Sequence, residues 1–158
     1  MSRVPCLDDR PHLRDVFRCF PKGLRPLLEY HDAVLRGDSP LSVGERELIA
    51  AYVSGLNACS FCAGSHRTIA ESAGIDGDLF DALMEDVDSS PLEDRLKPIF
   101  RYVRTLTKEP AKATDQMTAD ILRAGWPEEA VYDAVCVCAL FNFMNRLVEG
   151  MGVETDEA

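Results

Sequence analysis

Residues 42–74, with the sequence SVGERELIAAYVSGLNACSFCAGSHRTIAESAG, decide the fold because they predict two helices joined by a short turn. Ser42 and Glu45 form a capping box, in which each side chain can bind a free backbone N–H group at a helix start. An apolar run follows, and Asn57 predicts where that helix ends. The second helix then continues to Gly74, a residue type that is common just past a helix end.

The rest of the chain also shows helical patterns, with no internal repeat and no linker between domains. Apolar residues at helical spacing predict further helices over about 24–36, 115–124 and 127–149. Ser90 and Glu93 form a second capping box, which predicts another helix start. Strand signals are weak throughout the chain.

Length, composition and charge limit the classes of protein to consider. A chain of 158 residues favours one domain with its own core. We therefore predict an all-α, single-domain helical bundle over residues 1–158, with its motif-bearing core at about 42–74. The formal net charge of −10 opposes binding to nucleic acid and to anionic membrane surfaces. No segment is typical of a signal peptide or a membrane span, so we expect a cytoplasmic protein with reduced thiols.

Cys59 and Cys62 form a Cys-x-x-Cys pair at the start of the second predicted helix. The dipole and the free N–H groups of a helix start favour a thiolate over a thiol. Residues three apart lie on neighbouring positions of one helix face, so an oxidised sulfur can be attacked by its neighbour to give a short-loop disulfide. The pair therefore predicts redox chemistry.

Two further side chains accompany the cysteine pair. His66 lies one turn after Cys62, where an imidazole can exchange the thiol proton near neutral pH. In an antiparallel hairpin, Glu47 and His66 come roughly level, because each lies about 14–15 Å from the turn at Asn57. Ala51 and other small residues on the line of Glu47 permit close helix packing, which would bury the carboxylate beside His66.

The combined spacing is more specific than the cysteine pair alone. Glu47, eleven intervening residues, Cys59-x-x-Cys62, three intervening residues and His66 resemble the signature of the alkyl hydroperoxidase D-like (AhpD-like) branch of the carboxymuconolactone decarboxylase superfamily. This resemblance implies a helical bundle of the AhpD-like type that assembles into trimers or hexamers. It also implies a thiol peroxidase without haem, metal or other cofactor.

The resemblance also implies a role for each motif residue. By position, Cys62 is the peroxidatic thiol, Cys59 the resolving thiol, and Glu47 and His66 a proton relay. The best-known members of the family carry a histidine directly before the second cysteine, where this chain has Phe61. Either the relay works without that histidine, or the peroxidase rate is low and thiol–disulfide exchange is the main activity.

We therefore predict a thiol-dependent peroxidase that reduces organic hydroperoxides and is recycled by an external dithiol or redox protein. The alternative is a redox-sensing or thiol–disulfide exchange protein with little turnover. The same four side chains could bind zinc, but three ligands within two turns of one helix would strain a tetrahedral site, so we expect no metal. Lactone decarboxylation is disfavoured because it does not need the cysteine pair.

The other cysteines and histidines receive no chemical role. Cys136 and Cys138 point about 200° apart on a helix, so we predict that they fill the core. Cys6 and Cys19 have no partner spacing. His31 is predicted to be a surface residue or a satisfied polar residue.

Overall fold

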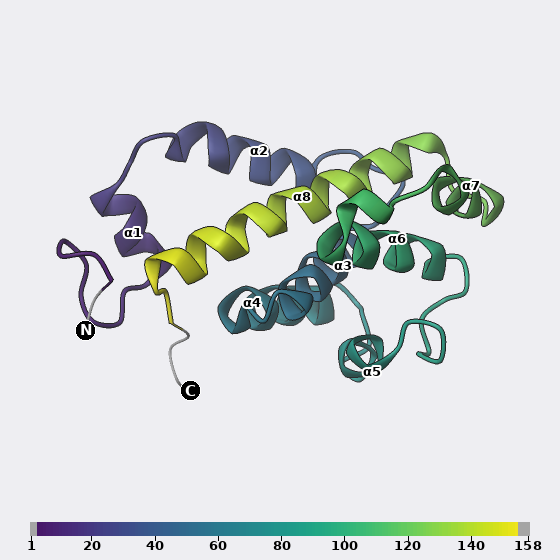
Figure 1. Ribbon diagram of the computed structural model, residues 1–158, viewed down its shortest axis with the longest axis horizontal. Coiled ribbons are helices and arrows are strands. Elements are labelled where there is room, and N and C mark those ends of the chain that lie inside the picture. Colours follow the sequence, from purple (N-terminus) through teal and green to yellow (C-terminus); the bar gives the residue numbers. More distant parts are fainter. Residues whose placement is uncertain (1–2, 155–158) are drawn as a thin grey trace.

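The computed structural model of the protein describes residues 3–154 and consists of α-helices, of which the longest, α8, runs from the side of α1 to that of α7 (Figure 1). The helices are α1 (Leu13–Cys19), α2 (Leu24–Arg36), α3 (Val43–Leu56), α4 (Ser60–Ser72), α5 (Leu79–Glu85), α6 (Lys97–Lys108), α7 (Asp115–Arg123) and α8 (Glu128–Met151). A short 3₁₀ turn, Pro110–Lys112, joins α6 to α7. No strand occurs among residues 3–154, so the predicted all-α class is confirmed.

The main core forms around α3, which packs against α4, α5, α6 and α8. Each large side chain that is fully buried here contributes about 1.5–3 kcal/mol of apolar burial. The largest such side chains in the core are Tyr52, Phe100, Phe141, Leu48, Ile49 and Ile99. This packing fixes α3, and with it every side chain that α3 presents to α4.

The α3–α4 hairpin forms as predicted. The Ser42 hydroxyl accepts a hydrogen bond from the Glu45 N–H group, and the Glu45 carboxylate accepts one from the Ser42 N–H group. At the turn, Ala58 adopts a left-handed conformation with φ of 56°, which costs a residue with a Cβ atom about 1–2 kcal/mol. The reversal lets the Cys59 N–H group bond to the Ser54 carbonyl at 2.9 Å. Cys59 thereby becomes the N-cap of α4.

The predicted helix start at Ser90 is wrong. The Ser90 hydroxyl donates a hydrogen bond to the Val87 carbonyl at 2.8 Å, and α6 begins only at Lys97. A helix that began at Ser90 would hold Pro98 in its interior, where proline lacks the N–H donor and clashes with the carbonyl four residues earlier. Pro98 is instead accommodated in the first turn of α6.

A second apolar cluster forms where α1 meets the start of α4 and the C-terminal end of α8 (Figure 1). We refer to it as the N-terminal cluster. Its buried members are Leu7, Val16, Cys59, Cys62, Val148 and Val153. The cysteine pair is therefore covered by side chains from residues 4–19, for which the sequence predicted no helix.

Within residues 3–154, α8 is the one helix long and apolar enough to cross a membrane. In this fold its apolar side chains have another role. Val137, Phe141 and Val148 are buried against the surrounding helices. The apolar residues of α8 thus contribute to both apolar clusters of the fold.

Candidate active site

Glu47 and His66 are brought together by the α3–α4 hairpin, as predicted. The Glu47 side chain is fully buried, and its Oε2 lies 2.5 Å from Nδ1 of His66. Its other oxygen, Oε1, forms an ion pair at 2.5 Å with Nη2 of Arg36, although the alignment is not that of a hydrogen bond. A buried carboxylate is stable only with such partners.

The electrostatics of this group favour an ionised Glu47. Burial raises the pKa of the carboxyl group, but the hydrogen bond from His66 and the positive charge of Arg36 outweigh it, so the pKa lies below its ordinary value. A carboxylate can only accept, so Nδ1 of His66 carries the proton between them. In the neutral imidazole this leaves Nε2 free to accept a proton.

Arg36 and His31 belong to the same site, and the sequence analysis missed both. They lie on α2, which places Arg36 beside Glu47 and the His31 ring next to the His66 ring, with ring centroids 6.1 Å apart. Burial, followed by the positive charge of His66, lowers the pKa of His31. The short connection from α2 to α3 was a usable signal, because it brings the end of α2 beside the start of α3.

The two thiols lie in the first turn of α4 with different electrostatic environments. Cys59 is fully buried and Cys62 is 3% exposed. The pKa of Cys62 lies below the ordinary value because the Cys59 thiol donates a hydrogen bond to it; burial opposes this shift, and the Asn145 side chain supports it. The same bond and burial raise the pKa of Cys59. Of the two thiols, Cys62 is therefore the more easily ionised, and Cys59 is the one that keeps its proton.

Asn145 connects the thiols to the hairpin turn. Its Nδ2 donates to the Ser54 hydroxyl at 2.9 Å, and its Oδ1 accepts from Nδ2 of Asn57 at 3.0 Å. The Asn145 side chain is buried, and these hydrogen bonds satisfy its amide. Its additional effect on Cys62 was not predicted, because the contact joins α8 to α4 across the whole fold.

The thiol pair and the Glu47–His66 pair remain separate within the described residues. No hydrogen bond joins Cys62 to His66 in residues 3–154, and the His66 ring packs edge-on against Phe141 with centroids 4.4 Å apart. Proton transfer between Cys62 and His66 therefore requires a water or a bound substrate between them. In the same part of the chain, no three or more His, Cys, Asp and Glu side chains are grouped so that they could hold a metal ion.

Two expectations for the remaining cysteines need correction. Cys6 and Cys19, which lack any partner spacing in the sequence, are joined as a disulfide with Cα atoms 6.7 Å apart. Their pairing depends on the fold of residues 6–19, in which α1 returns Cys19 to the loop that carries Cys6. Cys138 is a buried core residue as predicted, but Cys136 is only half-buried.

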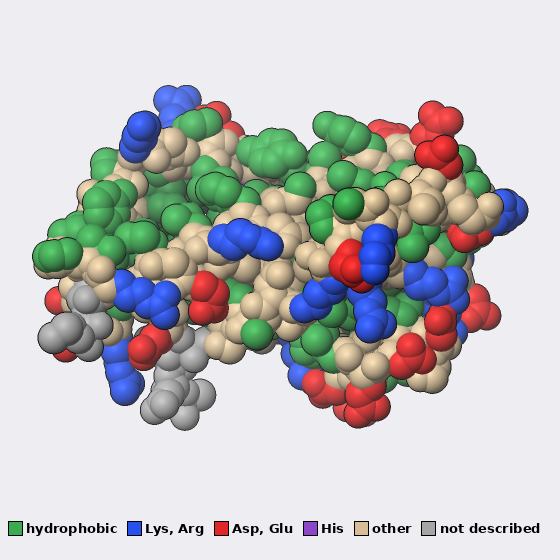
Figure 2. Space-filling model, viewed as in Figure 1, with side chains coloured by type: hydrophobic (Ala, Val, Ile, Leu, Met, Phe, Trp, Pro, Cys, Tyr) green, Lys and Arg blue, Asp and Glu red, His purple; other side chains and the backbone are tan. Residues whose placement is uncertain are grey.

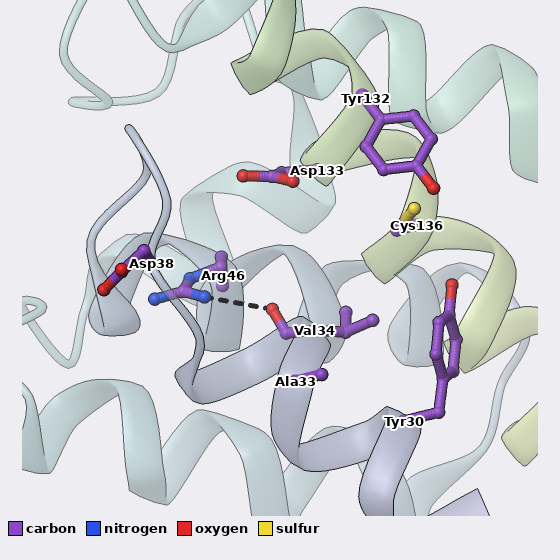
Figure 3. A pocket seen from close by; sticks show the side chains of 8 residues that line it. All are labelled: Tyr30, Ala33, Val34, Asp38, Arg46, Tyr132, Asp133 and Cys136. Carbon is purple, nitrogen blue, oxygen red and sulfur yellow. Dashed lines mark hydrogen bonds between the residues drawn. The ribbon is translucent and has the colours of Figure 1, made fainter.

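Cys136 lines a pocket of about 180 Å³ between α2 and α8 (Figure 3). Its sulfur points toward the Tyr132 hydroxyl, and the Tyr30 hydroxyl points toward Cys136 from the other side. A hydrogen bond with Cys136 raises the pKa of both phenols. Arg46 closes one side and donates to the carbonyls of Val34 and Gly37. The pocket is distinct from the Cys59–Cys62 pair, which lies in the N-terminal cluster.

The family model for carboxymuconolactone decarboxylases matches residues 21–96, which include all four motif residues. The chain belongs to the carboxymuconolactone decarboxylase family. The predicted family is therefore confirmed, and the match begins with α2 and ends just before α6. None of the curated proteins matches the chain in sequence.

Several solved structures show the same fold as this chain. A peroxidase-related protein from a Silicibacter species is 22% identical with a TM-score of 0.82, over 90% of this chain and 74% of that one. A peroxidase-related protein with an alkylhydroperoxidase AhpD core, from Ralstonia eutropha, is 21% identical with a TM-score of 0.83, over 90% of this chain and 75% of that one. The debrominase Bmp8, bound to 2,3,4-tribromopyrrole, is 15% identical with a TM-score of 0.77, over 90% of this chain and 75% of that one. The AhpD-like fold is thus confirmed, and it serves more than one activity.

Proposed function

We propose that the protein is a thiol-dependent peroxidase that reduces organic hydroperoxides. The observation that carries this proposal is the environment of Cys62. Its thiolate is favoured by Cys59 and Asn145, and the hydrogen-bonded pair of His66 and Glu47 lies one helical turn away. A nucleophile with a depressed pKa, a neighbouring thiol and a nearby base are the groups that peroxide reduction by thiols requires.

The chemistry proceeds in two stages. The Cys62 thiolate attacks one oxygen of the O–O bond, which gives a sulfenic acid and an alkoxide leaving group. His66, oriented by Glu47, takes up the proton of the Cys62 thiol at Nε2 and then gives this proton to the alkoxide, which becomes an alcohol. Both transfers pass through a water because no direct contact exists. The Cys59 thiol then attacks the sulfenic acid, which releases water and forms the Cys59–Cys62 disulfide. An external dithiol reduces this disulfide.

Apolar surroundings favour an organic substrate over hydrogen peroxide. Leu7, Val16 and Val148 surround the thiols, and Phe61 packs against the same cluster. An alkyl group gains about 25 cal/mol for each Å² of apolar surface that it buries against these residues, and hydrogen peroxide has no such surface.

A steady-state assay tests the proposed activity. Consumption of cumene hydroperoxide with excess dithiol is measured for wild type, Cys62→Ser and His66→Ala, with Cys136→Ser as the matched control. We expect no turnover for Cys62→Ser, about a 10²-fold or greater loss for His66→Ala, and no change for the control. Equal rates for wild type and Cys62→Ser would refute the proposed activity.

Thiol–disulfide exchange or redox sensing is the second candidate. It is favoured by the missing contact between Cys62 and His66 and by Phe61, which cannot transfer a proton. Repeated additions of hydroperoxide in the presence of dithiol separate the two candidates. A peroxidase consumes many equivalents per chain, whereas a sensor stops once its disulfide has formed.

We also propose that copies of this chain associate through an apolar groove between α8 and the α1–α2 segment. Figure 2 shows hydrophobic side chains gathered over this part of the molecule. The groove has a volume of about 470 Å³, and Phe20 and Phe143 are 44% and 53% exposed beside it. Such patches are typical of interaction sites. Sedimentation of wild type and Phe143→Asp tests this proposal: a wild type that sediments as a monomer would refute it.

A further inference from the structure

Four cysteines form a series from the protein surface to its interior. Cys6 is exposed, Cys19 is half-buried, and the Cys59 and Cys62 side chains are 0% and 3% exposed. The outer two are joined as a disulfide, while the inner two are free thiols. Accessibility therefore falls steadily from the first pair to the second.

The two pairs share one apolar environment. Cys19 packs against the N-terminal cluster, whose buried members include Cys59 and Cys62. Leu7 directly follows Cys6 and is also a member, so the backbone at both ends of the outer disulfide is held against this cluster. The ring of His12, between them in the chain, contacts the Phe61 ring with centroids 5.7 Å apart. The outer pair is thus attached to the start of α4.

The burial of the inner pair creates a problem for its reduction. A hydroperoxide is small enough to enter an apolar site, but a protein dithiol must bring its own sulfur into contact with a disulfide sulfur. The segment that carries Cys6 and Cys19 covers the inner pair. An external protein can therefore reach Cys6 far more easily than it can reach Cys59 or Cys62.

We propose that Cys6 and Cys19 form an internal relay that carries reducing equivalents from an external protein dithiol to the Cys59–Cys62 disulfide. The relay rests on the proposed peroxidase function, because that function generates the inner disulfide. It assigns a chemical role to Cys6 and Cys19, which lie outside residues 21–96, the segment that the family model matches.

The relay consists of three thiol–disulfide exchanges. The external dithiol reduces the Cys6–Cys19 disulfide and leaves as a disulfide itself. The Cys19 thiolate then attacks Cys59, which forms a Cys19–Cys59 bond and releases Cys62 as a thiolate. Finally the Cys6 thiolate attacks Cys19, which restores the Cys6–Cys19 disulfide and releases Cys59, and the released thiolate takes up a proton. Two electrons pass inward in each cycle, and no other reductant is needed.

The direction of the second exchange follows from the two inner thiols. Disulfide exchange is faster when the leaving sulfur is the more stable thiolate. Cys62 is that sulfur, because the Asn145 side chain favours its ionised form even when Cys59 is bonded to Cys19, whereas burial raises the pKa of Cys59. Attack at Cys59 therefore gives the better leaving group.

The test follows a single oxidation of the fully reduced protein. Wild type, Cys6→Ser, Cys19→Ser and the control Cys136→Ser are reduced, freed of reductant and treated with one equivalent of cumene hydroperoxide. Disulfides are then mapped by mass spectrometry. We expect wild type and the control to hold the Cys6–Cys19 disulfide, Cys19→Ser to hold Cys59–Cys62, and Cys6→Ser to accumulate the Cys19–Cys59 bond.

Stoichiometry and turnover complete the test. Without reductant, wild type should consume two equivalents, one for each pair, whereas Cys19→Ser should consume one. With thioredoxin as the protein dithiol, both serine variants should turn over at least about 10-fold more slowly than the control. Wild type that retains Cys59–Cys62 after one equivalent, with Cys6 and Cys19 reduced, would overturn the relay alone. A reduced wild type that consumes no hydroperoxide would overturn the proposed peroxidase as well.

Discussion

Replacement of Glu47 by glutamine tests whether its buried charge stabilises the candidate site. One carboxylate oxygen lies 2.5 Å from His66 and the other 2.5 Å from Arg36, whose side chain is 40% exposed. A hydrogen bond to a charged group contributes about 1.5–3 kcal/mol, and an ion pair with an exposed partner about 0.2–1 kcal/mol. Glutamine keeps the shape and one acceptor, so we expect Glu47→Gln to lower the free energy of unfolding by about 2 kcal/mol at neutral pH. The Tm should fall by about 4–8 °C.

The pH dependence of this stability difference separates the effect of the Glu47 charge from the effect of its packing. The pKa of Glu47 in the folded protein lies below its ordinary value of 4.5, so on acidification the unfolded chain takes up this proton first. The stabilisation is therefore complete above pH 4.5 and is lost as the pH falls through the folded pKa. The difference between wild type and Glu47→Gln should shrink over that range.

Denaturant unfolding at one fixed protein concentration, repeated from neutral to acidic pH, measures this difference. Glu71→Gln is the matched control, because Glu71 forms an ion pair with Arg67 near the surface and should change stability by less than about 1 kcal/mol. The reasoning is refuted if Glu47→Gln is as stable as wild type at neutral pH. It is also refuted if the difference in the free energy of unfolding between the two proteins is the same above and below pH 4.5.

Three further predictions concern the neighbours of this site. Asn145→Ala should move the ionisation of Cys62 to higher pH, which the ultraviolet absorbance of the thiolate reports; an unchanged titration would contradict the assigned hydrogen bond. Wild type should lose stability as the pH falls below 6.5, because the unfolded chain protonates His31 first, and His31→Gln should lose less over that range in denaturant unfolding. Ala51→Leu should lower the free energy of unfolding by about 1–3 kcal/mol in thermal melts, since the buried alanine leaves no room for the larger side chain; a neutral result would contradict close packing of α3.

The parts of the site that could be predicted from sequence depend on contacts that are local or cross one short turn. The Ser42 cap and the register of Glu47 with His66 are of this kind, because helix geometry fixes both once the turn is located. The helix start at Lys97 is equally local. The capping pattern at Ser90 predicts an earlier start, but Pro98 can be accommodated only in the first turn of the helix.

The remaining features depend on contacts between segments far apart in the chain. Asn145 reaches the thiols only because α8 crosses the α3–α4 hairpin, and no spacing rule encodes that crossing. The Cys6–Cys19 pair depends on how residues 6–19 fold back on themselves, and its place beside Cys59 depends on where α1 docks. Side-chain identities show which groups are reactive, but only the tertiary fold shows which reactive groups meet.

The buried amide of Asn145 also gives the two oxidation states of the thiols different energies. Its Nδ2 group donates a hydrogen bond to Ser54, and its side chain also favours the ionised form of Cys62. When Cys62 enters a disulfide the negative charge disappears, and the stabilisation that the Asn145 side chain gives to the thiolate is lost with it. The oxidised protein therefore carries a penalty that reduction removes, so the fold itself favours return to the dithiol state.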